Sequence, residues 1–251
     1  MTTILLLLGL FLLGLRLTGV QSIGVCYGLN GNNLPSKQDV INLYKRNGIQ
    51  RMRIYGPDPE VLNALKGTNI ELLVDVPNES IQDVATNPSA AANWVQNNIK
   101  KYSPAVKFRY ISVGNEVPVG SAVARYVGPA MEKIQKAIAS AGLQNQIKVS
   151  TSILTALEKE GGSKVNIVVS ETGWPSDGNP PAASSANAGT YYKNVIRHVM
   201  SGKGTPKKPG GGIETYLFAM FDENQKRGEE TEKHFGLFYP NQQPKYGISF
   251  K

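Results

Sequence analysis

The sequence of 251 residues contains one cysteine, Cys26, and two histidines, His198 and His234. A single cysteine excludes an internal disulfide, so a core of apolar side chains must stabilise the fold. Cys26 lies in the apolar stretch IGVCYG, where a buried thiol behaves as a small hydrophobic side chain. Neither histidine has a partner at a spacing typical of zinc sites, so we expect no metal and no other cofactor.

Nucleotide-binding signatures are also absent from the sequence. YGLNGNN, which follows the first predicted strand, does not supply G-x-G-x-x-G, and there is no Walker sequence. The formal net charge is +8, but the basic residues are scattered apart from KKP at 207–209, and no nucleic-acid-binding motif accompanies them. We therefore expect no nucleic-acid partner, and interpret the charge as a basic surface that holds the protein in an anionic extracellular matrix.

Long hydrophobic runs are limited to ILLLLGLFLLGL at residues 4–15. This run is shorter than the about 20 residues that a membrane span needs, and it is typical of a secretory signal. Val20 and Ser22 suit a cleavage site, so residues 1–22 are predicted to be a signal peptide and residues 23–251 the mature domain. A signal anchor is the alternative, because MTT contains no Lys or Arg. After cleavage we expect no membrane association.

One sequon for N-linked glycosylation occurs, Asn78-Glu79-Ser80. It follows a proline and is expected to be exposed. Asn78 is therefore a candidate glycan acceptor in a secreted protein.

Short apolar runs alternate with amphipathic segments along the rest of the chain. Most of the strand-like runs are apolar throughout, as in a parallel sheet that is covered on both faces. A doubly wound open sheet and a (β/α)8 barrel both fit this alternation. Strands are predicted at residues 23–28, 51–56, 70–77, 108–116, 147–153, 165–173 and 213–223, and helices at 36–48, 59–67, 89–102, 126–142 and 187–202.

Polar and aromatic residues recur at the carboxyl ends of the predicted strands, where barrel enzymes build their active sites. Glu116 is the last residue of YISVGNE, and Glu171 follows the run VVS in VVSETGW, where the strand is expected to end. We therefore favour an α/β fold of the TIM-type (β/α)8 barrel class, with both carboxyls on one rim. One protonated and one ionised carboxyl are the minimum equipment for glycoside hydrolysis, and Tyr27, Tyr55 and Trp174 would supply flat faces for sugar rings. Pairing with lysines or capping of helices is the alternative role for these glutamates.

The chain resembles the plant β-1,3-glucanases (glucan endo-1,3-β-glucosidases) of glycoside hydrolase family 17 from residue 23 to its end. The stretches that carry the resemblance include IGVCYG, RMRIYGP, LLVDVPN, RYISVGNEV, VVSETGWPS, FAMFDENQK and HFGLFYPNQQPKYGISF. VGNE and SETGWPS together are highly specific. The resemblance implies a (β/α)8 barrel that hydrolyses internal linkages of 1,3-β-glucan, from callose or fungal walls, with retention of configuration and a role in plant defence.

The resemblance also implies roles for individual residues. Glu116 would be the proton donor and Glu171 the nucleophile, while Asn115 would bond the sugar 2-hydroxyl. Lys226 would help to keep Glu171 ionised. The other substrate-binding positions, with Trp174 added from its place at a strand end, are Tyr27, Tyr55, Phe221, Glu223, Lys226 and Glu232.

The chain departs from the family pattern between STSI and VNIVV. Seven strands are recognisable where a closed barrel has eight, and about two βα units around the sixth strand are missing at the join of Ile153 and Leu154. Either the flanking strands pair directly across the short segment 154–162, or a slot with two exposed sheet edges remains. A splice variant and a gene-model artefact would each explain the join.

The shortening leaves alternatives to an active enzyme open, because a displacement of about 1 Å can cost about 100-fold in rate. They are a non-catalytic or severely weakened glucan-binding protein and a misfolding-prone product. The chain stops at Phe250-Lys251, without the vacuolar extension of some family members. We therefore expect secretion to the extracellular space or cell wall rather than the vacuole. We also expect a monomer.

Overall fold

The computed structural model describes residues 23–152, 166–206 and 208–250. The predicted signal peptide and the join of Ile153 and Leu154 lie outside the described residues. Within the described ranges, no helix has the length and apolar character needed to cross a membrane.

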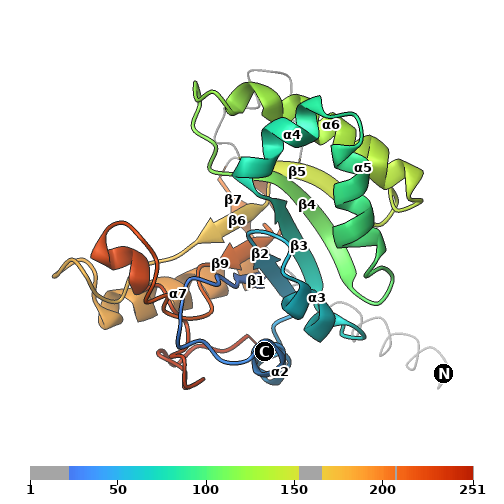
Figure 1. Cartoon of the computed structure of the whole chain (residues 1–251). Coiled ribbons are helices and arrows are strands. Elements are labelled where there is room, and N and C mark those ends of the chain that lie inside the picture. Colours follow the sequence, from blue (N-terminus) through green and yellow to red (C-terminus); the bar gives the residue numbers. More distant parts are fainter. Residues whose placement is uncertain (1–22, 153–165, 207, 251) are drawn as a thin grey trace, which may run out of the picture.

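Seven parallel strands form one sheet in the order β5-β4-β3-β2-β1-β9-β6 (Figure 1). Each strand predicted from the sequence is present in this sheet. The first strand lies inside the sheet and is buried along its whole length, which explains why its sequence is apolar throughout. The strands are β1 (Ile23–Cys26), β2 (Arg51–Ile54), β3 (Glu71–Val76), β4 (Lys107–Asn115), β5 (Lys148–Ser152), β6 (Val169–Thr172) and β9 (Thr215–Leu217), and β7 (Gly204–Thr205) pairs with β8 (Lys208–Pro209) in a separate hairpin.

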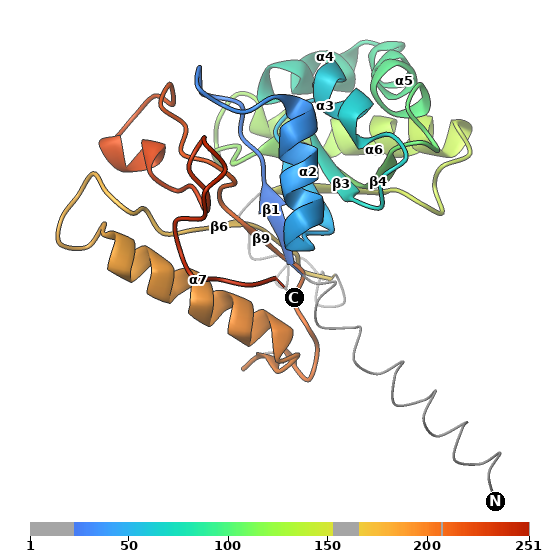
Figure 2. The ribbon, with the colours of Figure 1, turned by 90° about the horizontal axis from the view of Figure 1, so that it is seen from below.

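Helices cover the outer face of the sheet, with α4, α5 and α6 grouped together in Figure 1 and α7 apart from them in Figure 2. Helix α2 begins after the predicted N-cap Ser36, whose side chain accepts from the N–H of Asp39, and ends at Gly48 with φ 72°. The helices are α2 (Lys37–Asn47), α3 (Pro59–Leu65), α4 (Ile81–Thr86), α5 (Ala90–Val95), α6 (Ala124–Ser140) and α7 (Ser185–Met200), with short segments η2 (Asn78–Ser80), η3 (Gln96–Lys100) and η4 (Glu230–Lys233).

Strands β5 and β6 form the two edges of the sheet, and the described residues place no strand between them. The sheet nevertheless curls far enough that Ser152 Oγ on β5 lies 3.3 Å from Ser170 Oγ on β6. The sequence left two outcomes open for the shortened chain: direct pairing of these strands, or an open slot. Direct pairing is wrong for the described residues, because β5 and β6 meet there through the two serine hydroxyls and not through a backbone ladder. The arrangement is an incomplete (β/α)8 barrel.

Tyr192 of α7 connects this helix to the strand ends that carry the candidate site. Its hydroxyl is buried, lies 2.5 Å from the backbone oxygen of Phe218 and 3.0 Å from that of Phe235, and accepts from the N–H of Trp174 at 3.3 Å. Burial raises the pKa of the Tyr192 phenol, so the group stays protonated and donates. The turn after Glu171 is thereby fixed to the outer helix.

We expect Tyr192→Phe to lower the free energy of unfolding by about 1–3 kcal/mol, because it leaves buried backbone groups without their partner. Urea unfolding followed by circular dichroism measures this. Tyr126→Phe is the matched control, since among the described residues the Tyr126 hydroxyl forms a hydrogen bond with exposed Arg125 alone. Equal stability losses in the two variants would contradict the anchoring role.

Candidate active site

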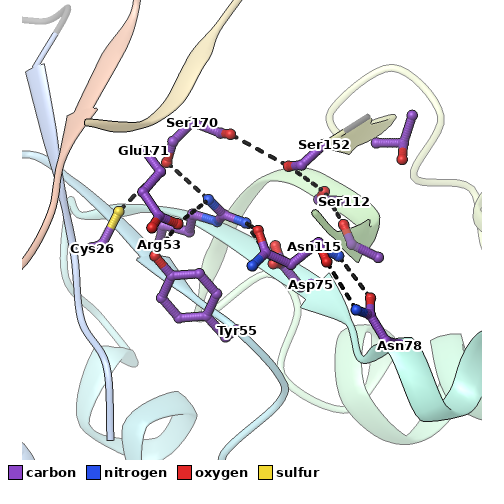
Figure 3. A network of polar contacts seen from close by, with 12 residues as sticks. Cys26, Arg53, Tyr55, Asp75, Asn78, Ser112, Asn115, Ser152, Ser170 and Glu171 are labelled. Atoms are coloured by element: carbon purple, nitrogen blue, oxygen red, sulfur yellow. Dashed lines mark hydrogen bonds and ion pairs between the residues drawn. The ribbon is translucent and has the colours of Figure 1, made fainter. Parts of the chain in front are cut away.

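Arg53, in β2, lies at the centre of a polar cluster inside the curled sheet (Figure 3). Its side chain is fully buried. Nη2 donates to Asp75 Oδ2 and to Asn115 Oδ1, each at 2.7 Å. Nη1 donates to Glu171 Oε2 at 3.2 Å and to the backbone oxygen of Ser170 at 3.0 Å. One guanidinium group therefore contacts residues from β3, β4 and β6.

Glu171, in β6, is held through one of its two carboxyl oxygens. Oε2 accepts from Arg53 and, at 2.6 Å, from the Tyr55 hydroxyl. Burial raises the pKa of the Tyr55 phenol, so it remains a donor. Oε1 accepts no hydrogen bond from the residues that the structure describes, and the side chain is 28% exposed. This leaves one oxygen accessible for chemistry.

Asp75 shares the Arg53 guanidinium with Glu171 but is itself buried. Its side chain is 1% exposed, and Oδ1 has no hydrogen-bond partner among the described residues. Burial raises the pKa of the Asp75 carboxyl to about 6, although Arg53 opposes this rise. The Arg53 guanidinium thus pairs with two carboxyls, the buried one of Asp75 and the more exposed one of Glu171.

Glu116 follows directly on the last residue of β4 and is exposed. Its backbone has φ 47°, and Gly114, two residues earlier, has φ 80°. A glutamate in this left-handed region is uncommon and strained. Its carboxyl forms no hydrogen bond or ion pair with any residue in the described ranges. A kinked strand end therefore presents an unpaired carboxyl to solvent beside Asn115.

The charged group Glu223, Lys226 and Glu232 lies near Glu171 but does not pair with it. Glu223 is 3% exposed, accepts from the N–H of Asn30 at 2.9 Å, and has a pKa raised by burial. Lys226 Nζ lies 2.8 Å from Glu232 Oε2 and 4.1 Å from the centre of the Phe218 ring. In the described residues, the cation that contacts Glu171 is Arg53 rather than Lys226.

The aromatic residues selected from the sequence lie in different surroundings. Tyr55 belongs to the Arg53 cluster, whereas Tyr27 and Phe221 are 1% and 2% exposed and pack edge to face. Their ring faces are therefore covered by protein. Trp174 packs on Tyr191 of α7, and its indole N–H donates to the backbone oxygen of Ala182 at 2.9 Å.

The sequence-based predictions missed Arg53 and Asp75. Each is a charged residue within an otherwise apolar strand, in RMRIYG and LLVDVP. A charge in a strand that is buried on both faces must be paired inside the sheet, which is the signal that could have identified them. Tyr55 directly follows β2, and its ring centre lies 4.5 Å from the guanidinium carbon of Arg53.

Cys26 is buried with its Sγ 3.5 Å from the backbone oxygen of Ser170, and burial raises the pKa of its thiol to about 12. The described ranges contain no group of three or more His, Cys, Asp or Glu residues that could hold a metal ion.

A curled parallel sheet with two glutamates at strand ends is typical of glycoside hydrolases of the barrel class. Residues 23–158 and 151–250 match the sequence profile of glycosyl hydrolases family 17. The chain belongs to this family. The two matched segments meet at residues 151–158, which contain the join predicted from the sequence.

Similar proteins agree with this assignment. The acidic isoform GI9 of glucan endo-1,3-beta-glucosidase from Nicotiana tabacum is 45% identical over 331 residues, covering 98% of this chain and 96% of that protein. The glucan endo-1,3-beta-glucosidase of Vitis vinifera is 46% identical over 337 residues, covering 98% of this chain and 97% of that protein. Both alignments are longer than the 251 residues of this chain, so they span positions that it lacks.

Solved structures show the same fold. The β-1,3-glucanase and allergen CJP38 of Cryptomeria japonica pollen superposes with a TM-score of 0.83 at 34% identity, covering 92% of this chain and 99% of that one. One of two plant β-glucan endohydrolases with distinct substrate specificities gives a TM-score of 0.83 at 36% identity, covering 90% and 99%.

A cavity of about 770 Å³ lies between α7 and the strands β6 and β9, and its lining includes none of the residues that contact Arg53. Its walls are mostly apolar and include Val169, Val195 and Ile213. It adjoins β6, the edge strand that follows the shortened stretch. It is therefore a surface of the incomplete barrel and not part of the polar cluster.

The raised pKa of Asp75 predicts a pH-dependent contribution to stability. Because the folded-state pKa of about 6 exceeds the unfolded value of about 4, this contribution is present below pH 4 and is lost as pH rises through 6. Relative to Asp75→Asn, the wild-type protein should gain about 1–3 kcal/mol in unfolding free energy between pH 7 and pH 4. Denaturant unfolding at four pH values measures the difference; a constant or opposite difference would overturn the assignment.

Proposed function

We propose that the protein is an endo-acting, configuration-retaining hydrolase of 1,3-β-glucosidic linkages. The observation that carries the proposal is the position of Glu171, held through Oε2 by Arg53 and Tyr55 with Oε1 accessible. The same guanidinium binds Asn115, whose neighbour is Glu116. The relatives named glucan endo-1,3-beta-glucosidases support the choice of linkage.

In the proposed reaction, Glu171 Oε1 attacks the anomeric carbon while Glu116 protonates the departing glycosidic oxygen. The bond to the leaving sugar breaks as the bond to Glu171 forms. Glu116, now ionised, takes a proton from water, whose oxygen then displaces Glu171 from the same carbon. Two inversions retain the configuration, and the mechanism requires the two carboxyls to be about 5 Å apart.

Arg53 and Asn115 have different roles in the proposed reaction. Arg53 fixes Glu171 without blocking Oε1. Since Arg53 also occupies Asn115 Oδ1, the amide nitrogen of Asn115 is left to donate to the sugar 2-hydroxyl. Glu223, Lys226 and Glu232, which lie near Glu171, are the other charged residues proposed to act in substrate binding.

We further propose that residues 1–22 are removed during secretion and that residues 23–251 act as a monomer in the extracellular space or cell wall. The apolar run at 4–15 and the net charge of +8 support this location. Callose and fungal wall glucan are the proposed natural substrates.

Purified protein should release reducing ends from laminarin, and Glu171→Gln should lower kcat by at least about 1,000-fold, because the amide is a poor nucleophile. Glu132→Gln, an exposed change on α6, should leave the rate unchanged. Proton NMR of the first products should show the β-anomer.

Two results would count against this proposal. Laminarin binding without turnover by the wild-type protein would instead support a glucan-binding protein. Absence of a soluble monomer would support a product that does not fold.

A further inference from the structure

The side chain of Asn78 forms a two-point contact with the backbone of Asn115 (Figure 3). Asn78 Oδ1 accepts from the N–H of Asn115 at 2.8 Å, and Asn78 Nδ2 donates to the backbone oxygen of Asn115 at 2.8 Å. The contact joins η2, which follows β3, to the end of β4. One side-chain amide therefore satisfies both backbone groups of the residue that precedes Glu116.

This contact lies at the strained part of β4. Asn115 is flanked by Gly114 with φ 80° and Glu116 with φ 47°. A backbone conformation of this kind persists only where surrounding contacts determine it. A Cβ on Gly114 would lie 2.7 Å from Val117 Cγ2 and 3.2 Å from Asn78 Oδ1, so the segment is closely enclosed. Asn78 supplies the polar part of that enclosure.

The Glu116 carboxyl has no partner of its own among the described residues, so its position depends on its backbone. Arg53 holds the Asn115 side chain, whereas Asn78 holds the Asn115 main chain. We propose that Asn78 is a positioning residue for the general acid and base Glu116, and that this use of its amide excludes an N-linked glycan at the same nitrogen. The proposal rests on the function proposed above.

The conflict with glycosylation follows from amide geometry. The proton that Asn78 donates lies on the same side of the amide C–N bond as Oδ1, since both atoms contact one residue. A glycan converts this group to a secondary amide, which strongly prefers the trans form. In that form the sugar carbon takes the place of the donated proton. A glycan on Asn78 would therefore break the contact with Asn115.

The test compares Asn78→Ala with Ser80→Ala, both made in a bacterial host that adds no glycan. Both changes destroy the sequon, but the Ser80 hydroxyl makes no capping hydrogen bond and its removal leaves the Asn78 contact intact. Two substrates are used: laminarin, whose leaving group needs protonation, and 2,4-dinitrophenyl β-laminaribioside, whose leaving group does not.

We expect Asn78→Ala to lower kcat/KM on laminarin by about 10- to 100-fold and on the dinitrophenyl substrate by less than about threefold. Ser80→Ala should match the wild-type protein on both substrates. Glu116→Ala supplies the reference pattern, and adding Asn78→Ala to it should cause no further loss on laminarin.

Equal losses on both substrates, or no loss on laminarin, would overturn the positioning role while leaving the proposed function intact. A wild-type protein that turns over neither substrate would overturn the proposed function and this inference together.

The glycan is tested separately in a secretory eukaryotic host, with Ser80→Ala as the unglycosylated control. Peptide mass spectrometry of the active fraction should find Asn78 unmodified, and any glycosylated fraction should show the laminarin defect of Asn78→Ala. A glycosylated fraction with wild-type kcat/KM on laminarin would contradict the exclusion.

Discussion

The structure of the site depends on one buried cation, the guanidinium of Arg53. A fully buried charge is tolerated only when it is paired and hydrogen-bonded, and Arg53 meets this requirement with Asp75, Asn115 and Glu171. The planar, forked group reaches three strands at once, which a lysine could not do. The same contacts that satisfy the buried charge also fix the nucleophile and the residue beside the acid.

The incomplete barrel gives this interaction added importance. In a closed barrel, β4 and β6 would be linked from both directions around the sheet. The described residues place no strand between β5 and β6, so the ladder that they form runs from β4 through β3, β2, β1 and β9 to β6. Arg53 crosses the interior between these strands, and the hydroxyls of Ser152 and Ser170 meet at the gap. Side-chain contacts therefore help to hold β4, β5 and β6 in position, as backbone pairing would do in a closed barrel.

The two candidate catalytic carboxyls are held by different means. Glu171 is bound directly through Oε2, while Glu116 is placed by the backbone that carries it. A nucleophile must be fixed and ionised, whereas an acid that later acts as a base must exchange protons with sugar and water. Direct pairing suits the first role, and an unpaired carboxyl on a rigid backbone suits the second.

Apolar periodicity and capping residues such as Ser36 are local signals, so they were enough to predict the seven strands and most of the helices. The family motifs likewise identified Glu116 and Glu171 as candidates. The partners that these residues contact depend on the tertiary structure. It paired Arg53 rather than Lys226 with Glu171, covered the rings of Tyr27 and Phe221, and turned the sequon residue Asn78 toward Asn115. These contacts join strand ends that are far apart in the sequence. Which of them meet depends on how the sheet curls, and residue spacing does not predict that curvature.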